Sequence, residues 1–430
     1  MKYERIDKNL YVSNRNNFAR LMTTGSIAVF NSNDIYPISA DSTMPFQQHR
    51  DILYLSGVDQ EESILVIFPD AKNDAHKEVL FLKETSELIA IWEGEKLTKD
   101  AAFEVSGIRT VYWLDQFASI FKQMMAEATT VYINTNEHLR ASTTVETRED
   151  RFIKKLKIDY PAHQVAKSAP LMHRLRCVKH SLEIECMQRA CKITEAGFRR
   201  LLSFVKPGIW EYEIEAELAH EFLRNRSKGF AYTPIIASGK NACVLHYIEN
   251  NKQCLDGDVL LLDVGAEYAN YASDLTRCIP VNGRFTTRQK AVYNAVLHVK
   301  KEAEKLLVPG TIMAEYHKEV GKLMEEQLLQ LGLIDHTDIK NQRAEWPAYK
   351  KYFMHGTSHF LGLDTHDVGL WNEPIQAGMV FTCEPGIYIP EEGIGIRLED
   401  DLVVQNSGAP FNLMKDIPLE AEEIEDLMNV

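Results

Sequence analysis

Four carboxylates and one imidazole occupy short apolar or glycine-rich segments in the second half of the chain, where charged side chains are costly. These residues are Asp263, Asp274, His359, Glu384 and Glu399. Carboxylates buried close together need a cation, because each unpaired ion in an interior of low dielectric constant costs several kcal/mol. Carboxylates with an imidazole are ligands for hard or borderline divalent metals, and the oxygens present suffice for two ions. The sequence therefore predicts a fold that gathers these five residues around metal.

The two aspartates flank a predicted hairpin. Asp263 ends an apolar run that is typical of a buried strand, and the midpoint between Asp263 and Asp274 falls between Tyr268 and Ala269. A tight turn there places the two aspartates opposite each other on one face, with Cβ atoms roughly 4.5–5.5 Å apart. The alternative is that an aspartate forms a salt bridge, for example with Arg277.

The two glutamates form a second pair. The midpoint between Glu384 and Glu399 falls in the segment 391–393, which favours a turn. Pro385 and Gly386 favour a bulge, so the pattern is weaker here. Two hairpins that each present a carboxylate pair would suit a centre with two ions about 3.5–4 Å apart.

Composition limits the class of protein. A chain of 430 residues with 45% hydrophobic and 26% charged residues predicts two globular domains. The net charge is −14 and basic residues form no stripe, which disfavours nucleic-acid binding. We expect no membrane association, since we find no signal-peptide pattern and no apolar run of about 18 residues. Seven cysteines without zinc-finger spacing predict free thiols and a cytoplasmic location.

Residues 1–168 predict an α/β domain of their own. Ser13 is a candidate cap for a helix that runs to Met22. Short apolar runs predict strands at 27–30, 52–55, 64–68, 79–82 and 131–133.

Residues 169–430 predict a second domain with an internal repeat. A helix over 181–205 ends at Pro-Gly and precedes another helix, and a helix over 287–308 repeats this order. Each helix pair leads to strands that carry the carboxylates, which predicts a duplicated domain with pseudo-two-fold symmetry and a site between its halves. The alternative is that Pro-Gly is simply a common helix stop.

Three histidines lie within twelve residues of one another. His355, His359 and His366 share a segment with Gly356 and Gly362, which favours loops over the helix of the His-Glu-x-x-His zinc proteases. We expect His359 to bind metal and the other two to face the substrate or to support the ligands.

Two further residues are weaker candidates. His246 follows a glycine-containing loop and has little support by itself. Arg397 precedes Glu399 by two positions, so on a strand both side chains would share a face and the guanidinium could orient metal-bound carboxylates. The alternative for Arg397 is a salt bridge on the strand surface.

The motifs together resemble the metallopeptidases of the pita-bread fold, over the whole chain. They are Asp263-Val264-Gly265-Ala266, Ser273-Asp274-Leu275-Thr276-Arg277, His355-Gly356-Thr357-Ser358-His359, Leu363-Asp364-Thr365-His366-Asp367, Glu384-Pro385-Gly386-Ile387-Tyr388 and Gly395-Ile396-Arg397-Leu398-Glu399-Asp400. The resemblance implies an N-terminal α/β domain and a C-terminal pita-bread domain, an α/β (α+β) class. Within the family the chain is most similar to aminopeptidase P, partly because prolidases often have glycine at the position of Ser358.

This resemblance implies a metal-dependent aminopeptidase that hydrolyses the N-terminal Xaa-Pro bond of peptides with proline at position two. Two divalent ions, most simply Mn²⁺, would activate a hydroxide, with Asp263, Asp274, His359, Glu384 and Glu399 as ligands. The alternatives are a prolidase, which cleaves only the Xaa-Pro dipeptide, and a metal-containing module that binds peptides without turnover.

The resemblance also implies roles for the residues around the metals. Glu384 would take the proton of the attacking water, His366 would stabilise the tetrahedral intermediate and His246 would serve the leaving group. The proline pocket would involve His355 with Tyr388. Arg397 would hold the carboxylates and relay a proton.

Family members of this type are dimers or tetramers, so we expect a homodimer or homotetramer. Trp92 is a candidate to reach a neighbouring subunit's site, although a partly buried core tryptophan is the simpler interpretation.

Overall fold

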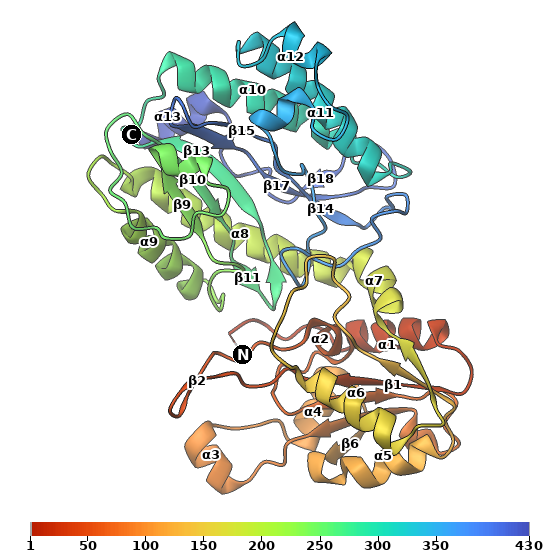
Figure 1. Cartoon of the computed structure of the whole chain (residues 1–430). Coiled ribbons are helices and arrows are strands. Elements are labelled where there is room, and N and C mark those ends of the chain that lie inside the picture. Colours follow the sequence, from red (N-terminus) through yellow and green to blue (C-terminus); the bar gives the residue numbers. More distant parts are fainter. Residues whose placement is uncertain (1, 430) are drawn as a thin grey trace. The chain divides into compact units, whose positions relative to one another are not determined.

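The computed structural model describes residues 2–429 and divides into two compact units. One unit is Arg5–Arg176, and the other comprises the remaining described residues. The division therefore falls between Arg176 and Cys177, eight residues beyond the predicted boundary at 168. Each unit has its own sheets (Figure 1).

A six-stranded mixed sheet forms the centre of the N-terminal unit, in the order β6-β5-β4-β1-β7-β8. Its strands are β1 (Ser26–Asn31), β4 (Ile64–Ile67), β5 (Glu78–Leu82), β6 (Thr110–Trp113), β7 (Thr130–Ile133) and β8 (Gln164–Lys167). A short hairpin, β2 (Pro37–Ser39) with β3 (Ser42–Thr43), lies apart from it. The helices are α1 (Asn9–Leu21), α2 (Arg50–Ser56), α3 (Glu87–Glu93), α4 (Lys99–Ser106), α5 (Phe117–Met125), α6 (Arg148–Asp159) and α7 (Ala169–Cys177).

Alternation along the strands builds the core of this unit. Every second residue of β1, β4 and β5 is apolar and packs against α5 and α6, as with Ile27, Val29 and Phe81. From the helices, Phe121 and Leu156 meet this face. The period of two in the strands and the amphipathic helices thus bury one common core.

Two sequence predictions in this unit are wrong. The run 52–55 is not a strand but the interior of α2, where the His49 side chain accepts a hydrogen bond from the Asp51 N–H and Gly57 ends the helix with φ 70°. Its residues are all buried, and a short buried run has no periodicity that separates strand from helix. Helix α1 begins at Asn9, so Ser13 is not its cap.

The predicted burial of Trp92 is also wrong. The side chain is 81% exposed on α3, a helix with no buried residue. Leu88 and Ile91 on the same helix are exposed as well. Helix α3 therefore presents apolar side chains to solvent within its unit.

The second unit contains the predicted repeat of two helix pairs followed by strands. The first half has α8 (Ser181–Phe204), α9 (Glu211–Arg224), β9 (Ile235–Ser238), β10 (Val259–Val264), β11 (Glu267–Tyr268), β12 (Tyr271–Ala272) and β13 (Leu275–Pro280). The second has α10 (Thr287–Glu304), α11 (Met313–Gln330), α12 (His336–Lys340), β14 (Val380–Cys383), β15 (Gly386–Ile389), β16 (Ile394–Arg397), β17 (Asp400–Val403), β18 (Phe411–Asn412) and α13 (Ala421–Met428).

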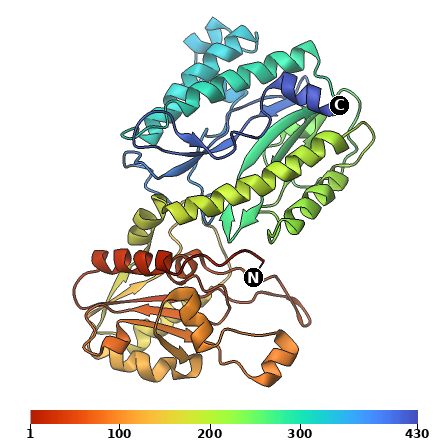
Figure 2. The same ribbon diagram turned by 180° about the vertical axis from the view of Figure 1, so that it is seen from behind.

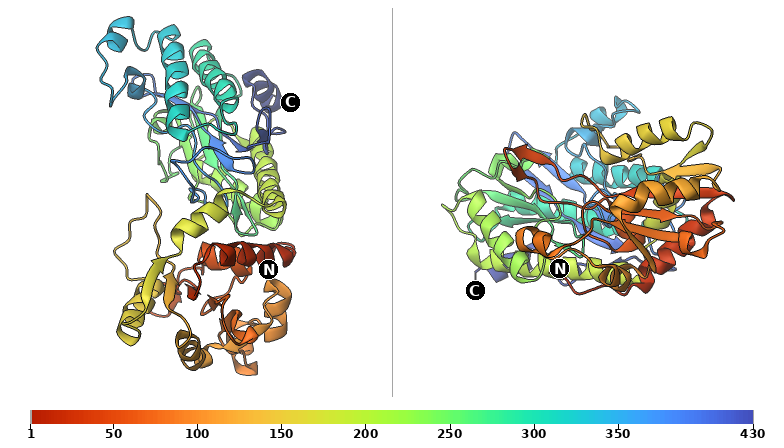
Figure 3. Two further views of the ribbon diagram at one scale, coloured as in Figure 1. Left: turned by 90° about the vertical axis from the view of Figure 1, so that its right-hand side faces the viewer. Right: turned by 90° about the horizontal axis from the view of Figure 1, so that it is seen from below.

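The two helix pairs lie on the outside of this unit and the strands lie between them (Figure 2). Helix α8 packs against α9, and α10 packs against α11, which run side by side (Figure 3). Strands β14 to β17 are buried along their whole length, as helices on the outside require.

The first hairpin turns one residue later than predicted. Asp263 pairs with Thr276, not with Asp274, because the turn residues are Ala269 and Asn270. Both have positive φ values, 54° and 68°, which suits the twist of a tight hairpin. The pairing is shifted by two residues. Because side chains alternate between faces with a period of two, Asp263 and Asp274 still lie on the same face of the hairpin.

The second hairpin has the predicted register without a bulge. The β14–β17 ladder and the β15–β16 ladder share one register, with Cys383 opposite Asp400 and Gly386 opposite Arg397. Glu384 and Glu399 therefore lie opposite each other where the two ladders separate. Their N–H groups instead bond the carbonyls of neighbouring segments, at Thr357 and Thr276.

Three other sequence predictions concern the cysteines, membrane-spanning helices and the histidine-rich segment 355–367. All seven cysteines are free thiols, as predicted. Among residues 2–429, no helix has the length and apolar character needed to cross a bilayer. Segment 355–367 contains no helix, as its glycines indicate.

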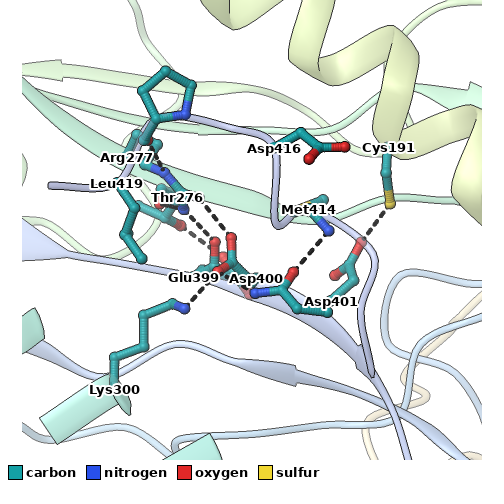
Figure 4. Close-up of polar contacts among 12 residues, drawn as sticks. Cys191, Thr276, Arg277, Lys300, Glu399, Asp400, Asp401, Met414, Asp416 and Leu419 are labelled. Carbon is teal, nitrogen blue, oxygen red and sulfur yellow. Dashed lines mark hydrogen bonds and ion pairs between the residues drawn. The ribbon is translucent and has the colours of Figure 1, made fainter. Parts of the chain in front are cut away.

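A buried ionic network lies directly behind the second hairpin (Figure 4). Asp400 on β17 accepts from Arg277 at 2.6 Å and from Lys300 of α10 at 2.5 Å, and all three side chains are at most 1% exposed. Arg277 also donates to the backbone carbonyl of Glu399 at 2.6 Å. One carboxylate thus joins β13, β17 and α10 and holds the position of Glu399.

We predict that Asp400→Ala destabilises the protein by about 3–5 kcal/mol, because it leaves Lys300 and Arg277 buried without their shared counter-ion. Denaturant unfolding measures the change. Asp416→Asn is the matched control, since its partner Lys192 is half exposed at the surface. Equal stability of the two variants would contradict the role given to the network.

Candidate metal centre and active site

Four of the five predicted ligands meet at the seam between the two halves of the second unit. Ligand atoms of Asp274, His359 and Glu399 all lie within 4.8 Å of one another, and these residues are buried. The Nε2 atom of His359 is 3.5 Å from Asp274 Oδ2 and 3.5 Å from Glu384 Oε1. The first half thus supplies Asp274, and the second half supplies the other three.

Asp263 adjoins this group from β10. Its Oδ1 accepts from the hydroxyl of Tyr232 at 2.7 Å, and its Oδ2 lies 2.5 Å from Arg397 Nη2. The charge of Asp274 is close enough to help raise the pKa of Asp263. The predicted alternative of a salt bridge with Arg277 is wrong, because Arg277 binds Asp400, and the arginine that reaches Asp263 is Arg397.

The backbone orients His359 for metal binding. Its Nδ1 donates to its neighbour's carbonyl, Phe360 O, at 3.0 Å. When the ring is neutral, this bond leaves the lone pair of Nε2 on the side of Asp274 and Glu384, where a bound cation could accept it. Such a bond to the far nitrogen fixes the tautomer and orientation of metal-ligating histidines.

Electrostatics show that the carboxylates are crowded. Burial, with repulsion from neighbouring carboxylates, raises the pKa of Glu384 to about 7 and raises the pKa of Glu399 well above its ordinary value. Burial also raises the pKa of Asp263, although Arg397 opposes this. Burial lowers the pKa of His359, but Asp274 and Glu384 outweigh it and the net pKa rises. These pKa shifts are expected where several carboxylates lie close together in a region of low dielectric constant with too few positive charges nearby.

One oxygen atom of Glu399 indicates that a cation can bind among these carboxylates. The Oε1 of Glu399 is buried and has no hydrogen-bond partner among residues 2–429, while its Oε2 accepts from Thr276 at 2.6 Å. A buried carboxylate oxygen without a donor costs free energy unless a cation occupies its lone pair. The donor set of oxygens with one imidazole therefore fits divalent metal ions.

Arg397 is buried, so its interpretation as a surface salt bridge is wrong. Its Nε donates to Thr276 Oγ1 at 3.2 Å, and Thr276 in turn donates to Glu399. Arg397 thus reaches Asp263 directly and Glu399 through one hydroxyl. Sequence reasoning missed Thr276 and Tyr232: Thr276 belongs to a motif already noted, whereas no local signal marks Tyr232.

A hydrogen-bonded row connects Arg397 with His355. Arg397 Nη1 donates to the Tyr388 hydroxyl at 2.8 Å, and that hydroxyl donates to His355 Nε2 at 2.7 Å. The opposite nitrogen, Nδ1, donates to Gly356 O at 2.8 Å. Burial lowers the pKa of His355 to about 3, so the ring is neutral in this arrangement. The same ring lies against Phe353.

The other two predicted histidines are exposed. The ring of His366 lies 4.5 Å from the ring of His359 in an edge-to-face arrangement, so it borders the metal ligands. His246 is exposed as well. An exposed imidazole beside buried ligands can contact a substrate.

Comparisons with known proteins agree with this site. Residues 185–406 match the model of metallopeptidase family M24, and residues 11–132 match the aminopeptidase P N-terminal domain. The matched family region contains all five predicted ligands. Among curated proteins, the Xaa-Pro aminopeptidase of Escherichia coli is 35% identical over 438 residues, covering 98% of each chain.

Solved structures agree along nearly the whole chain. A putative aminopeptidase P from Bacillus anthracis matches with a TM-score of 0.91 and 33% identity, covering 99% of each chain. A zinc-substituted E. coli aminopeptidase P in complex with product matches with a TM-score of 0.87 and 33% identity, also over 99% of each chain. The predicted combination of an N-terminal α/β domain with a pita-bread domain is confirmed, and this chain belongs to metallopeptidase family M24.

Proposed function

We propose that this metal-dependent aminopeptidase hydrolyses the bond between the first residue of a peptide and a proline at position two. The observation that carries the proposal is the imidazole of His355, held by Tyr388 and Phe353 beside the buried cluster of Asp274, His359 and Glu399. The relatives named Xaa-Pro aminopeptidase or aminopeptidase P support the same specificity.

We propose two ions, with Mn²⁺ as the physiological metal. Five ligands that supply up to eight carboxylate oxygens exceed the needs of one ion, and carboxylate-rich sites suit Mn²⁺ better than four-coordinate zinc. When bound, the ions would lower the pKa of a water molecule and polarise the scissile carbonyl. Asp263 would hold one ion, His359 and Glu384 would hold the other, and Asp274 and Glu399 would serve both.

The surrounding side chains handle protons and position the substrate. Glu384, whose carboxylate is partly open to solvent, takes the proton of the attacking water. His366 stabilises the oxyanion of the tetrahedral intermediate from the edge of the site. Arg397 holds the carboxylates in place, and general acid–base assistance of this kind contributes about 10²–10⁴-fold.

Proline itself requires a particular pocket. Its nitrogen carries no N–H, so the site cannot recognise a donor there, and the ring must be bound by shape and apolar contact. The ring of His355, which is partly exposed, offers such a surface, and Tyr388, which is 1% exposed, holds that ring through its hydroxyl. The leaving amine must gain a proton, and we assign this step to the exposed His246.

We predict that the Mn²⁺-loaded protein releases the first residue from Ala-Pro-Ala at least about tenfold faster than from Ala-Ala-Ala, because only proline fills the pocket. Amino-acid release measured by chromatography tests this. Ala-Pro is the informative control: cleavage of Ala-Pro with no cleavage of Ala-Pro-Ala would identify a prolidase instead.

We predict that Asp274→Ala abolishes metal retention and lowers turnover by about 10³-fold or more, since a metal centre contributes several kcal/mol of transition-state stabilisation. Elemental analysis and the peptide assay measure both effects. The metal-free variant should melt no lower than the metal-free parent, because one repelling carboxylate is gone. Normal metal content with normal turnover would contradict the ligand assignment.

We also propose a homodimer or homotetramer that covers α3. Leu88, Ile91 and Trp92 expose apolar surface on one short helix, and burying such side chains favours association. The triple replacement by serine should shift the oligomer to smaller species in analytical ultracentrifugation. A parent chain that is monomeric at micromolar concentration would refute this.

A further inference from the structure

A cavity of about 880 Å³ adjoins the candidate active site along α11. One face of α11 forms its wall, with His317, Lys318 and Lys322 spaced as neighbours on a helix. The segment 342–350 lines the opposite side, and His355 to Thr357 form the end nearest the metal ligands.

The two sides of this cavity are in close contact at one point. Tyr349 packs directly on Gly321, where a Cβ atom would come within 2.7 Å of the tyrosine ring. The segment 342–350 is therefore held close to α11 by a contact that only glycine permits. The cavity is a built feature of the fold rather than a gap between separate surfaces.

Two hydrogen bonds connect the cavity with the metal ligands. The Thr357 N–H donates to His317 Nδ1 at 3.3 Å, and the Thr357 carbonyl accepts from the Glu384 N–H at 2.7 Å. Burial lowers the pKa of His317 to about 4, so its ring is neutral near pH 7 and its proton is on Nε2. The Nε2–H of His317 can therefore donate a hydrogen bond to a ligand in the cavity. Through Thr357, the same ring is connected to the backbone of Glu384.

The charge of the cavity opposes that of the chain. The net charge of the protein is −14, yet the lining holds four full cations and a single carboxylate, Glu325. The cations are Lys318, Lys322, Arg343 and Lys350. Lys322 is already paired with Glu319 at 2.6 Å, whereas no ion pair of Lys318 or Arg343 is found within residues 2–429. A concave surface of this kind attracts an anion.

The position of His355 tells which part of a peptide would reach this cavity. His355 and Tyr388 border the proposed proline pocket, and His355 also lines the cavity, so the two spaces share this residue. Residues that follow proline in a bound peptide would therefore extend along α11.

We propose that this cavity is a subsite for a carboxylate in the peptide segment after the proline. The carboxylate is either the C-terminus of a short peptide or an acidic side chain, and Lys318 with Arg343 are its principal partners. The inference rests on the proposed function, because it requires peptides to bind with proline beside His355.

Matched peptides test the subsite and separate the two carboxylate sources. Ala-Pro-Ala is compared with its C-terminal amide, and Ala-Pro-Ala-Glu-amide with Ala-Pro-Ala-Gln-amide. The parent enzyme should favour one or both carboxylate forms by about three- to tenfold in kcat/KM, as a partly exposed charge pair allows. The preference should fall as salt rises from 0.05 to about 0.5 M, because ions screen exposed charges.

The double variant Lys318→Gln with Arg343→Gln should lose this preference while it still cleaves the amides at the parent rate. Lys206→Gln is the control, since it removes an exposed charge from the same unit without touching the cavity. Equal kcat/KM values for all four peptides in the parent enzyme would overturn the subsite.

Binding supplies a readout that needs no turnover. Calorimetry compares Pro-Ala-Glu-amide with Pro-Ala-Gln-amide, and Pro-Ala with Pro-Ala-amide. In at least one pair, the parent should bind the peptide with the additional carboxylate more tightly. The double variant should bind both members of each pair equally. Equal affinities within both pairs would overturn the subsite. A normal binding preference without cleavage of any Xaa-Pro peptide would instead contradict the proposed function and support the subsite.

Discussion

Repulsion among buried carboxylates is the constraint on which the second unit depends. Asp274 and Glu399 are buried close together and Glu384 lies beside them, and burial with their mutual repulsion raises the pKa values of the two glutamates. Folding would avoid this arrangement unless a cation offset the charge. Arg397 supplies one fixed positive charge through Asp263, and the orphaned oxygen of Glu399 marks where more is required.

The fold holds this arrangement through contacts that cross its two halves. Thr276 on β13 pairs across the hairpin with Asp263 and also bonds Glu399, so one threonine connects both carboxylate pairs. Behind it, Asp400 joins the arginine of β13 to the lysine of α10. Structural ion pairs and metal ligands therefore occupy adjacent positions on one strand, where Glu399 faces the site and Asp400 faces the core.

Sequence reasoning predicted which side chains come together better than it predicted the local backbone geometry. Burying a charged side chain in an apolar segment costs free energy, and this cost pointed to the five residues. The helix–helix–strand repeat indicated that they meet between the two halves of the second unit. The register of the first hairpin was missed because positive φ values at Ala269 and Asn270 moved the turn by one residue. Likewise α2 was missed because a short apolar run has no distinguishing period. The roles of Thr276 and Tyr232 depend on pairing across long sequence separations, which no local pattern encodes.

The most direct test of this account is anomalous diffraction at the manganese edge from crystals of the Mn²⁺-loaded protein. The account predicts two anomalous peaks about 3.5–4 Å apart, one near Asp263 and one near His359, with Glu399 in contact with both. A density map without anomalous signal among these residues, from protein that cleaves Xaa-Pro peptides, would contradict it.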